Sequence, residues 1–400
     1  MSSQPGLIDI HVRPGHPDFL DLPWHLPLAR WTEACGRMVE VERGLSRHDV
    51  IFAGYGHGVY AFKELPFRAG EREYDLLREL EESKLPAVTP AGHARARITE
   101  DERHSVLITR YLESSVPYRT LFMNSGMERY RDRLLDAMAG LLVRLHLAGF
   151  YWGDCSLSNT LFRRDAGELQ SYLVDAETSE HHEALGDGLR RQDLLIMMEN
   201  VAGELADLSA VVELPGGLGV NETGAIIRDR YERLWSEITR EEAIASSESY
   251  RIHERIRALN ELGFSVGEVE LIATGVGNQL RVRTIVTDRD YHRHILHSLT
   301  GIVAGDRQAA LMLNEIRELK ATLSQDLDRS VPMSMAAHRW LHERYNSAIQ
   351  MLASLTPRTE DLPEAYCQVL EHKWYLSERA HGDVGLEHAI EDFVRRFPKV

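Results

Sequence analysis

The stretch at residues 145–162 reads LHLAGFYWGDCSLSNTLF, an order typical of a helix end, a turn, a polar loop and a short strand. Gly149 marks the turn, because glycine readily adopts the left-handed backbone that ends a helix. In the polar loop, Asp154 is followed five residues later by Asn159, just before the apolar residues of the strand. Asp175 comes sixteen residues after Asn159, at the end of a second apolar strand. Two carboxylates and one amide therefore follow structural elements at defined spacings.

This set of side chains has the composition that phosphoryl transfer needs. One carboxylate, Asp154, would orient the attacking hydroxyl, while Asn159 and Asp175 would hold magnesium against the phosphates. An Asp and an Asn at this spacing are common by chance. The helix before them, the strands around them and the second carboxylate make the pattern far more specific. We therefore expect ATP and Mg2+ as cofactors.

Apolar spacing predicts the elements around this loop. Leucine and methionine residues recur at helical spacing over 127–147 and form one continuous stripe. Short strands are predicted at 160–162 and 171–174, followed by helices at 190–206 and 222–238. Upstream, strands are predicted at 38–42, 49–53, 59–65 and 105–112, with a helix at 70–83.

A lysine on the strand at 59–65 supplies the other half of a phosphate site. In phosphoryl-transfer enzymes of one class, a strand lysine contacts the phosphates and a helix glutamate holds it. Lys63 fits the first requirement. The following helix offers three candidates for its partner: Glu71, Glu73 and Glu79. Glu73 shares a helical face with the leucines that must face the core, so we predict the pair Lys63–Glu73.

The full string resembles the catalytic loop and metal-binding strand of the protein kinase-like superfamily. It is most similar to the Gly-Asp form of small-molecule members, such as aminoglycoside and choline phosphotransferases, and to lipopolysaccharide-core sugar (Kdo) kinases. The resemblance covers roughly residues 36–245. The remainder resembles an uncharacterised bacterial family in which such a domain precedes a domain of unknown function.

The kinase-like order of elements implies where the phosphates would be covered. The glycine-rich segment 54–58 lies only five residues before Lys63, so it is interpreted as the turn between two strands. The covering loop would instead be 44–48, where Ser46 and backbone amides would contact phosphate.

The resemblance also implies an adenine site and an aspartate that supports the catalytic loop. Backbone groups near Arg110 and Leu112, after the strand that begins at residue 105, would bind the base. Asp193 occupies the place where the superfamily often has a buried aspartate that braces the catalytic loop.

We therefore expect an α+β, two-lobed protein kinase-like fold with a mostly helical C-terminal domain. The five prolines of the first thirty residues predict an irregular N-terminal arm over 1–35. An antiparallel β N-lobe is expected at 36–113, a helical C-lobe at 114–245 and the C-terminal domain at 246–400. Within the last domain, a helix is predicted at 250–262 and strands at 268–273 and 279–287, with mostly helix beyond.

Composition limits the partners and the compartment. The 400 residues carry a formal net charge of −16, which excludes bulk electrostatic binding to nucleic acid. Three cysteines cannot build a disulfide framework and favour a reducing compartment. Neither a secretory signal nor a transmembrane segment is recognisable, so we expect a cytoplasmic protein.

Departures from the protein kinase pattern bear on the acceptor. The segment 152–153 reads Trp-Gly rather than His-Arg, 175–177 reads Asp-Ala-Glu rather than Asp-Phe-Gly, and no Ala-Pro-Glu follows. These features favour transfer of the γ-phosphate to a hydroxyl of a small-molecule, sugar or lipid-linked acceptor. Alternatives are a protein kinase, a nucleotide-binding pseudokinase adaptor whose C-terminal domain recruits a protein partner, and a nucleotidyl-transferring enzyme.

Overall fold

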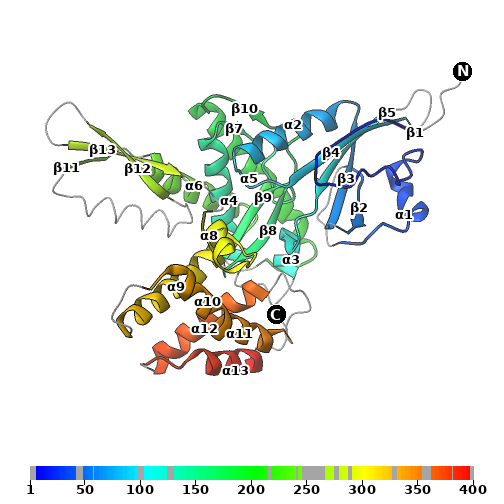
Figure 1. The fold of residues 1–400 in the computed structure, drawn as a ribbon. Helices are drawn as coiled ribbons and strands as arrows, with labels where there is room; N and C mark the ends of the chain where they lie inside the picture. The colour runs from blue at the N-terminus through cyan, green and yellow to red at the C-terminus, as the bar shows by residue number, and fades with distance from the viewer. Residues whose placement is uncertain are drawn as a thin grey trace, which may run out of the picture. The chain divides into compact units, whose positions relative to one another are not determined.

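The computed structural model divides the chain into two compact units, Met1–Arg163 with Gln170–Arg240 and Arg164–Leu169 with Glu241–Val400 (Figure 1). The described residues are 6–41, 48–56, 58–97, 103–123, 130–166, 168–214, 218–239, 242–245, 266–273, 279–286, 291–326, 331–353, 362–380 and 382–396. The predicted covering-loop residue Ser46 and the helix predicted at 250–262 lie outside them.

An antiparallel sheet opens the first unit. In spatial order its strands are β1 (Gly6–Val12), β4 (Thr89–Arg97), β5 (Arg103–Arg110), β3 (Gly58–Pro66) and β2 (Val50–Tyr55). Each neighbouring pair is antiparallel, and Lys63 of β3 lies opposite Leu107 of β5. The turn between β2 and β3 falls within residues 54–58, where the sequence predicts it.

The two faces of the sheet bury different side chains, because successive residues of a strand point to opposite sides. Helix α2 (Ala69–Glu82) packs against β3, β4 and β5, and Lys63 contacts it. Tyr60 and Phe62, the alternate residues of β3, join a separate apolar cluster. That cluster holds five large side chains from the N-terminal segment: Phe19, Leu22, Trp24, Leu28 and Trp31.

The structure differs from the predictions in the N-terminal segment and in the strands of the sheet. The irregular arm expected over 1–35 is wrong for Gly6–Val12, which forms edge strand β1, and short helical turns follow at η1 (Leu28–Arg30) and α1 (Trp31–Ala34). Proline spacing signals breaks but not the long-range pairing that makes an edge strand. Strand β4 was not predicted, because Pro90, Gly92 and its alanines have low strand propensity, although alanine and arginine alternate over residues 94–97. At the strand predicted over 38–42, the described part makes only a single bridge, Met38 to Ala53.

Helices dominate the rest of the first unit. They are α3 (Tyr118–Met123), α4 (Arg131–Leu147), α5 (Asp187–Ser209) and α6 (Thr223–Thr239). Short strands lie between them: β6 (Ser115–Pro117), β7 (Phe150–Tyr151), β8 (Thr160–Asp165), β9 (Glu168–Leu173) and β10 (Glu180–His181). Strand β8 pairs with β6 and β9, so the segment after the catalytic loop is held in a small sheet.

The second unit combines a small sheet with helices. Its strands are β11 (Glu242–Ala245), β12 (Val266–Ala273) and β13 (Gln279–Val286), with β13 in the centre. Its helices are α8 (Tyr291–Thr300), α9 (Asp306–Asp326), α10 (Met333–Trp340), the π-helix η4 (Leu341–Tyr345), α11 (Asn346–Leu352), α12 (Leu362–Ala380) and α13 (Leu386–Arg396). These helices share one apolar core that includes Trp340, Tyr366 and Phe393.

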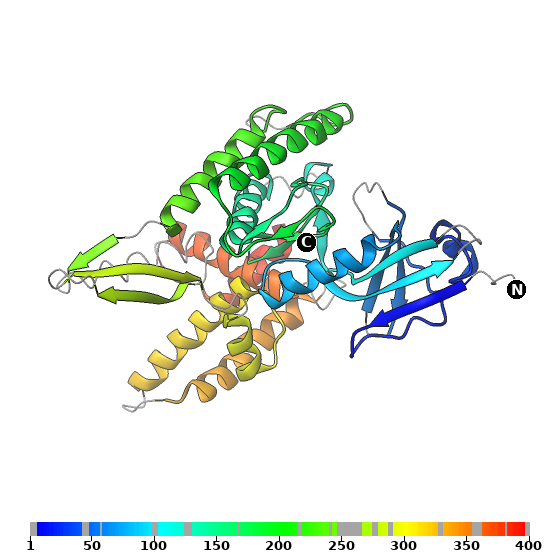
Figure 2. The ribbon, with the colours of Figure 1, turned by 90° about the horizontal axis from the view of Figure 1, so that it is seen from above.

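An antiparallel sheet followed by helical parts is the α+β arrangement that the sequence predicts, and the fold class is confirmed (Figure 2). Within the part of the chain that the structure describes, none of the helices has the length and apolar character required to cross a bilayer.

Candidate active site

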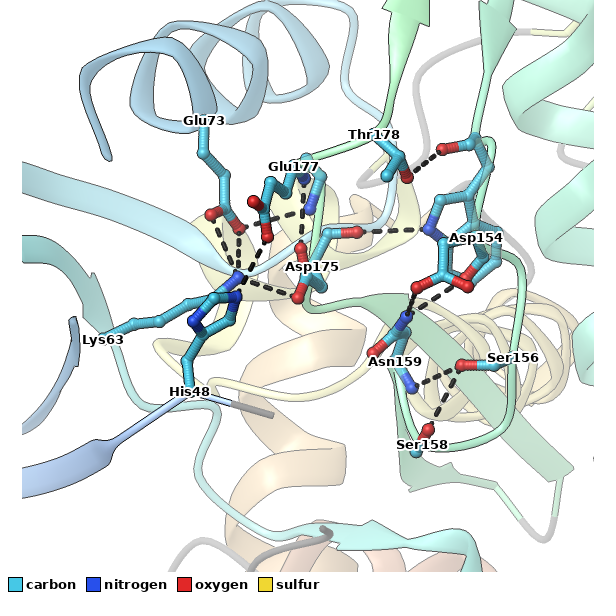
Figure 3. A network of polar contacts seen from close by, with 12 residues as sticks. His48, Lys63, Glu73, Asp154, Ser156, Ser158, Asn159, Asp175, Glu177 and Thr178 are labelled. Carbon is cyan, nitrogen blue, oxygen red and sulfur yellow. Dashed lines mark hydrogen bonds and ion pairs between the residues drawn. The ribbon is translucent and has the colours of Figure 1, made fainter. Parts of the chain in front are cut away.

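Lys63 lies between two carboxylates (Figure 3). Its Nζ donates to Oε1 and Oε2 of Glu73 at 3.2 and 3.0 Å, and to Oδ2 of Asp175 at 2.7 Å. Glu73 also accepts the backbone N–H of Ala176 at 3.2 Å, so it is tied to the segment that carries Asp175. The pair expected from helical spacing is therefore present, since Glu73 lies on the buried face of α2.

Burial and charge oppose each other in this group. Burial raises the pKa of Glu73 to about 7, although Lys63 favours its ionised form. Burial would lower the pKa of Lys63, but Glu73 and Asp175 outweigh it and raise that pKa. Burial would likewise raise the pKa of Asp175, but Lys63 outweighs it and lowers that pKa. Lys63 is thus a fixed positive charge next to Asp175.

The loop that follows α4 and β7 presents Asp154 and Asn159 together. Asn159 Nδ2 donates to the backbone oxygen and to Oδ2 of Asp154, both at 3.1 Å. The other carboxylate oxygen, Oδ1, accepts a hydrogen bond from Asn200 Nδ2 at 2.9 Å. The two oxygens of Asp154 therefore accept from two different amides.

Asp193 holds the start of this loop from α5. Its side chain is fully buried and accepts the backbone N–H groups of Trp152 at 2.7 Å and Gly153 at 2.8 Å. His146 Nε2 lies 3.0 Å from the same carboxylate. Gly153 has φ +79°, and a Cβ there would lie 2.8 Å from the carbonyl oxygen of Thr178. The glycine before Asp154 is therefore required by backbone shape and by space.

Glu204, also on α5, holds the middle of the loop. Its carboxylate accepts the backbone N–H groups of Leu157 and Ser158, each at 2.8 Å. Burial raises the pKa of Glu204, and these hydrogen bonds partly offset that effect. Neither Glu204 nor Asn200 was predicted as part of the site. They lie more than forty residues after Asp154, and nothing in their local sequence marks them.

A cavity of about 570 Å³ contains the predicted site residues. Lys63, Asp154, Asn159 and Asp175 line it, as do the predicted hinge residues Arg110 and Leu112. Apolar side chains supply much of the remaining wall near the strands: Val50, Phe52, Ala61, Val88, Leu161 and Val174. The cavity thus combines an apolar wall, which suits a planar base, with many charged and amide side chains, which suit phosphates and a hydroxyl acceptor.

His48, the last residue of the predicted covering loop, approaches the segment after Asp175. Its Nε2 lies 3.2 Å from Oε2 of Glu177. The backbone N–H of Glu177 donates to Oδ1 of Asp175 at 3.0 Å. Trp152 Nε1 donates to the backbone oxygen of Asp175 at 3.1 Å, so several elements fix this turn.

The oxygen atoms of Asp175 and Asn159 are suitable ligands for a magnesium ion. Asp175 offers carboxylate oxygens and Asn159 an amide oxygen, the hard ligands that Mg2+ prefers. The amide nitrogen of Asn159 is engaged by Asp154, which leaves its oxygen on the other side of the group. Among the described residues, no group of three or more histidine, cysteine or carboxylate side chains could enclose a metal alone. Phosphate oxygens would complete the coordination, as is usual for Mg2+.

The sheet, the buried Lys–Glu pair and the Asp-Asn loop together define a kinase-like domain. Residues 55–210 match the family described as "Lipopolysaccharide kinase (Kdo/WaaP) family". This match supports the conclusion that the protein is a kinase. Residues 233–397 match the family described as "Domain of unknown function (DUF4032)". The resemblance found in the sequence is thereby confirmed: a kinase-like domain precedes a DUF4032 domain.

Solved structures resemble the chain only distantly. A structure of WaaP in complex with acyl carrier protein shares 17% identity, covers 64% of this chain and 99% of its own, and has a TM-score of 0.37. An aminoglycoside-3'-phosphotransferase of type VIII shares 18%, covers 58% and 97%, and scores 0.36. The BubR1 kinase domain shares 16%, covers 38% and 52%, and scores 0.27. No curated protein matches the chain in sequence.

Proposed function

We propose that this protein is an ATP- and Mg2+-dependent phosphotransferase that moves the γ-phosphate to a hydroxyl of a small-molecule, sugar or lipid-linked acceptor. The observation that carries the proposal is the cavity in which Lys63, Asp154, Asn159 and Asp175 meet. Lys63 is fixed there by Glu73, and Asp154 is fixed by two amides.

Each residue has a defined part in this reaction. Lys63 neutralises the α- and β-phosphates, and Glu73 keeps its ammonium group in place. Asp154 orients the acceptor hydroxyl and takes its proton as the oxygen bonds to the γ-phosphorus. The bond from the γ-phosphorus to the β–γ bridging oxygen breaks, and ADP leaves. Asn159 and Asp175 would hold magnesium, which would supply positive charge against the phosphates.

Nucleotide binding uses the strand side of the cavity. Backbone groups near Arg110 and Leu112 contact adenine, and Ser46 with neighbouring amides covers the phosphates. Both hinge residues line the cavity, which supports the first part of this assignment.

We assign the reaction to residues 36–245 and the recruitment of a protein partner to residues 246–400. We also assign the protein to the cytoplasm. Cys35, Cys155 and Cys367 all lie in the described part of the chain as free thiols, which supports a reducing compartment.

Magnesium-dependent ATP binding and slow ATP hydrolysis by the purified full chain test the proposal. Asp154→Ala should abolish hydrolysis and spare ATP binding. Asp175→Ala should abolish hydrolysis too, and it should also weaken the dependence of ATP binding on Mg2+. Glu213→Ala, which removes an exposed carboxylate outside the cavity, is the control. Undiminished turnover by Asp154→Ala would refute the assignment. Tight binding without hydrolysis would favour the pseudokinase alternative, and acceptor screening would follow a positive result.

A further inference from the structure

One stripe of α5 contacts the catalytic loop along its length. Asp193, Asn200 and Glu204 stand at positions i, i+7 and i+11, which fall on one side of a helix. Asp193 accepts backbone N–H groups at 152 and 153, and Glu204 accepts those at 157 and 158. Asn200 lies between them and contacts residues 154 and 155.

Asn200 differs from its two neighbours because it reaches the side chain of Asp154. Its Nδ2 donates to Oδ1 of Asp154 at 2.9 Å and to the backbone oxygen of Cys155 at 3.0 Å. A side-chain amide has two N–H donors, so both are used. The bond to the backbone oxygen of Cys155 fixes the rotation of the amide, and the other N–H is then directed at Asp154.

From this geometry we infer that Asn200 is the positioning residue that sets the orientation of the Asp154 carboxylate. The inference rests on the proposed function, because it concerns the group that would orient the acceptor hydroxyl. Asn159 holds Oδ2 from within the loop, and Asn200 holds Oδ1 from a different element. Two donors from separate directions restrict rotation of the carboxylate.

The rate of phosphoryl transfer should depend on this contact more than nucleotide binding does. Transfer requires the attacking oxygen within a narrow range of distance and angle, and a misplacement of about 1 Å can cost about 100-fold. Asn200 lies on the α5 side of the cavity, whereas the predicted adenine contacts lie after β5. Its removal should therefore lower kcat and leave ATP affinity unchanged.

The test is Asn200→Asp in the full chain, measured by Mg2+-dependent ATP hydrolysis, ATP binding and thermal unfolding. Aspartate has the shape of asparagine but offers no N–H donor, and it faces Asp154 with a like charge. We expect kcat to fall about 100-fold, with the Kd for ATP within about twofold of the wild-type value. Gln192→Asp introduces the same charge at an exposed position of α5 and should leave both values unchanged.

Two other results would overturn the inference. A kcat for Asn200→Asp close to that of the wild type, with Asp154→Ala inactive, would leave the proposed function intact and remove the role of Asn200. A parallel fall in kcat, ATP affinity and Tm would mean that Asn200 only stabilises the fold. If Asn200→Asp fails to fold, Asn200→Ser is judged by the same criteria. A wild-type protein that neither binds nor hydrolyses ATP would refute the proposed function itself, before any variant is compared.

Discussion

At Glu73, burial and charge act in opposite directions, and the outcome sets a pH dependence. Burial raises the pKa of this carboxyl to about 7, against the attraction of Lys63. Above that pH, Glu73 is ionised and holds the ammonium group that contacts the phosphates. Below it, protonation weakens this hold. Protonation of Glu73 therefore removes one of the two carboxylate charges that hold Lys63, while Asp175 remains.

We expect kcat/KM for ATP to fall as the pH drops through about 7. Glu73→Gln should have a lower kcat/KM at pH 8 and should lose this acid limb, because glutamine does not titrate. Stability should move in the opposite direction. A carboxyl whose pKa is higher in the folded than in the unfolded state stabilises the fold most at low pH, and this contribution is lost as the pH rises through about 7. A profile that is identical in wild type and Glu73→Gln would contradict the assignment.

The backbone conformation of Gly153 leads to a second prediction. Gly153→Ala should destabilise the protein by about 1–2 kcal/mol or more, because its left-handed φ disfavours a Cβ and Thr178 blocks the space. Gly203→Ala is the matched control. No heavy atom of the described residues lies within 4 Å of a Cβ there, and the site is helical, so alanine should stabilise by about 0.5–1 kcal/mol. Thermal unfolding measures both, and shifts of the same sign would contradict this account.

At the scale of elements, α5 is the brace of the catalytic loop. The loop leaves its backbone N–H groups without strand or helix partners at several points, and buried N–H groups need acceptors. Carboxylates of α5 supply them at both ends of the segment 152–158. The helix thus converts a polar loop into a rigid one.

Glu204→Ala should loosen this loop. Loss of an acceptor for two partly buried N–H groups costs about 1–3 kcal/mol, which corresponds to roughly 5- to 150-fold faster amide exchange. Amide hydrogen exchange over residues 156–159 measures the effect. Asp207→Ala, at an exposed position of the same helix, should leave the exchange unchanged. Equal protection in both variants would show that Glu204 does not hold the loop.

At the scale of the whole molecule, the division into units does not follow the chain order. Residues Arg164–Leu169, from the end of β8 into β9, belong to the second unit. Asp165 is fully buried there and accepts the backbone N–H groups of Arg307 at 3.2 Å and Gln308 at 2.9 Å. These amides begin α9, so a residue from the kinase-like half of the sequence caps a helix of the C-terminal half.

Asp165→Ala should therefore destabilise the second unit by about 1–2 kcal/mol, the usual cost of removing a capping carboxylate. Hydrogen exchange of the first turn of α9 would report it. Glu318→Ala, at an exposed position on the same helix, is the control and should have no effect. A fragment of residues 241–400 should be less stable in α9 than the full chain. If that fragment is equally protected in α9, the segment at 164–169 is not needed for the cap.

Local patterns in the sequence predicted most of the elements and several residues that the structure brings together around the cavity. An apolar run that follows glycines predicted β3 with Lys63. Helical spacing selected Glu73 among three glutamates, because only its face turns toward the leucines. The spacing from Asp154 to Asn159 lies within one loop, so local geometry alone brings them into contact. The apolar residues before Asp175 likewise marked a strand that ends in a polar group.

Features that depend on distant segments required the tertiary structure. Strand β1 pairs with β4, at least eighty residues away, and this pairing made it an edge strand although the nearby prolines suggested an irregular arm. Its residues 8–12 do alternate between apolar and polar, a local strand signal that the prediction missed. Asn200 and Glu204 are ordinary polar residues of a helix until packing sets α5 against the catalytic loop. Asp165 acquires its role only through the start of α9. Periodicity is determined by neighbouring residues in the chain, whereas these contacts arise from the packing of whole elements, and that packing decided which polar side chains complete the site.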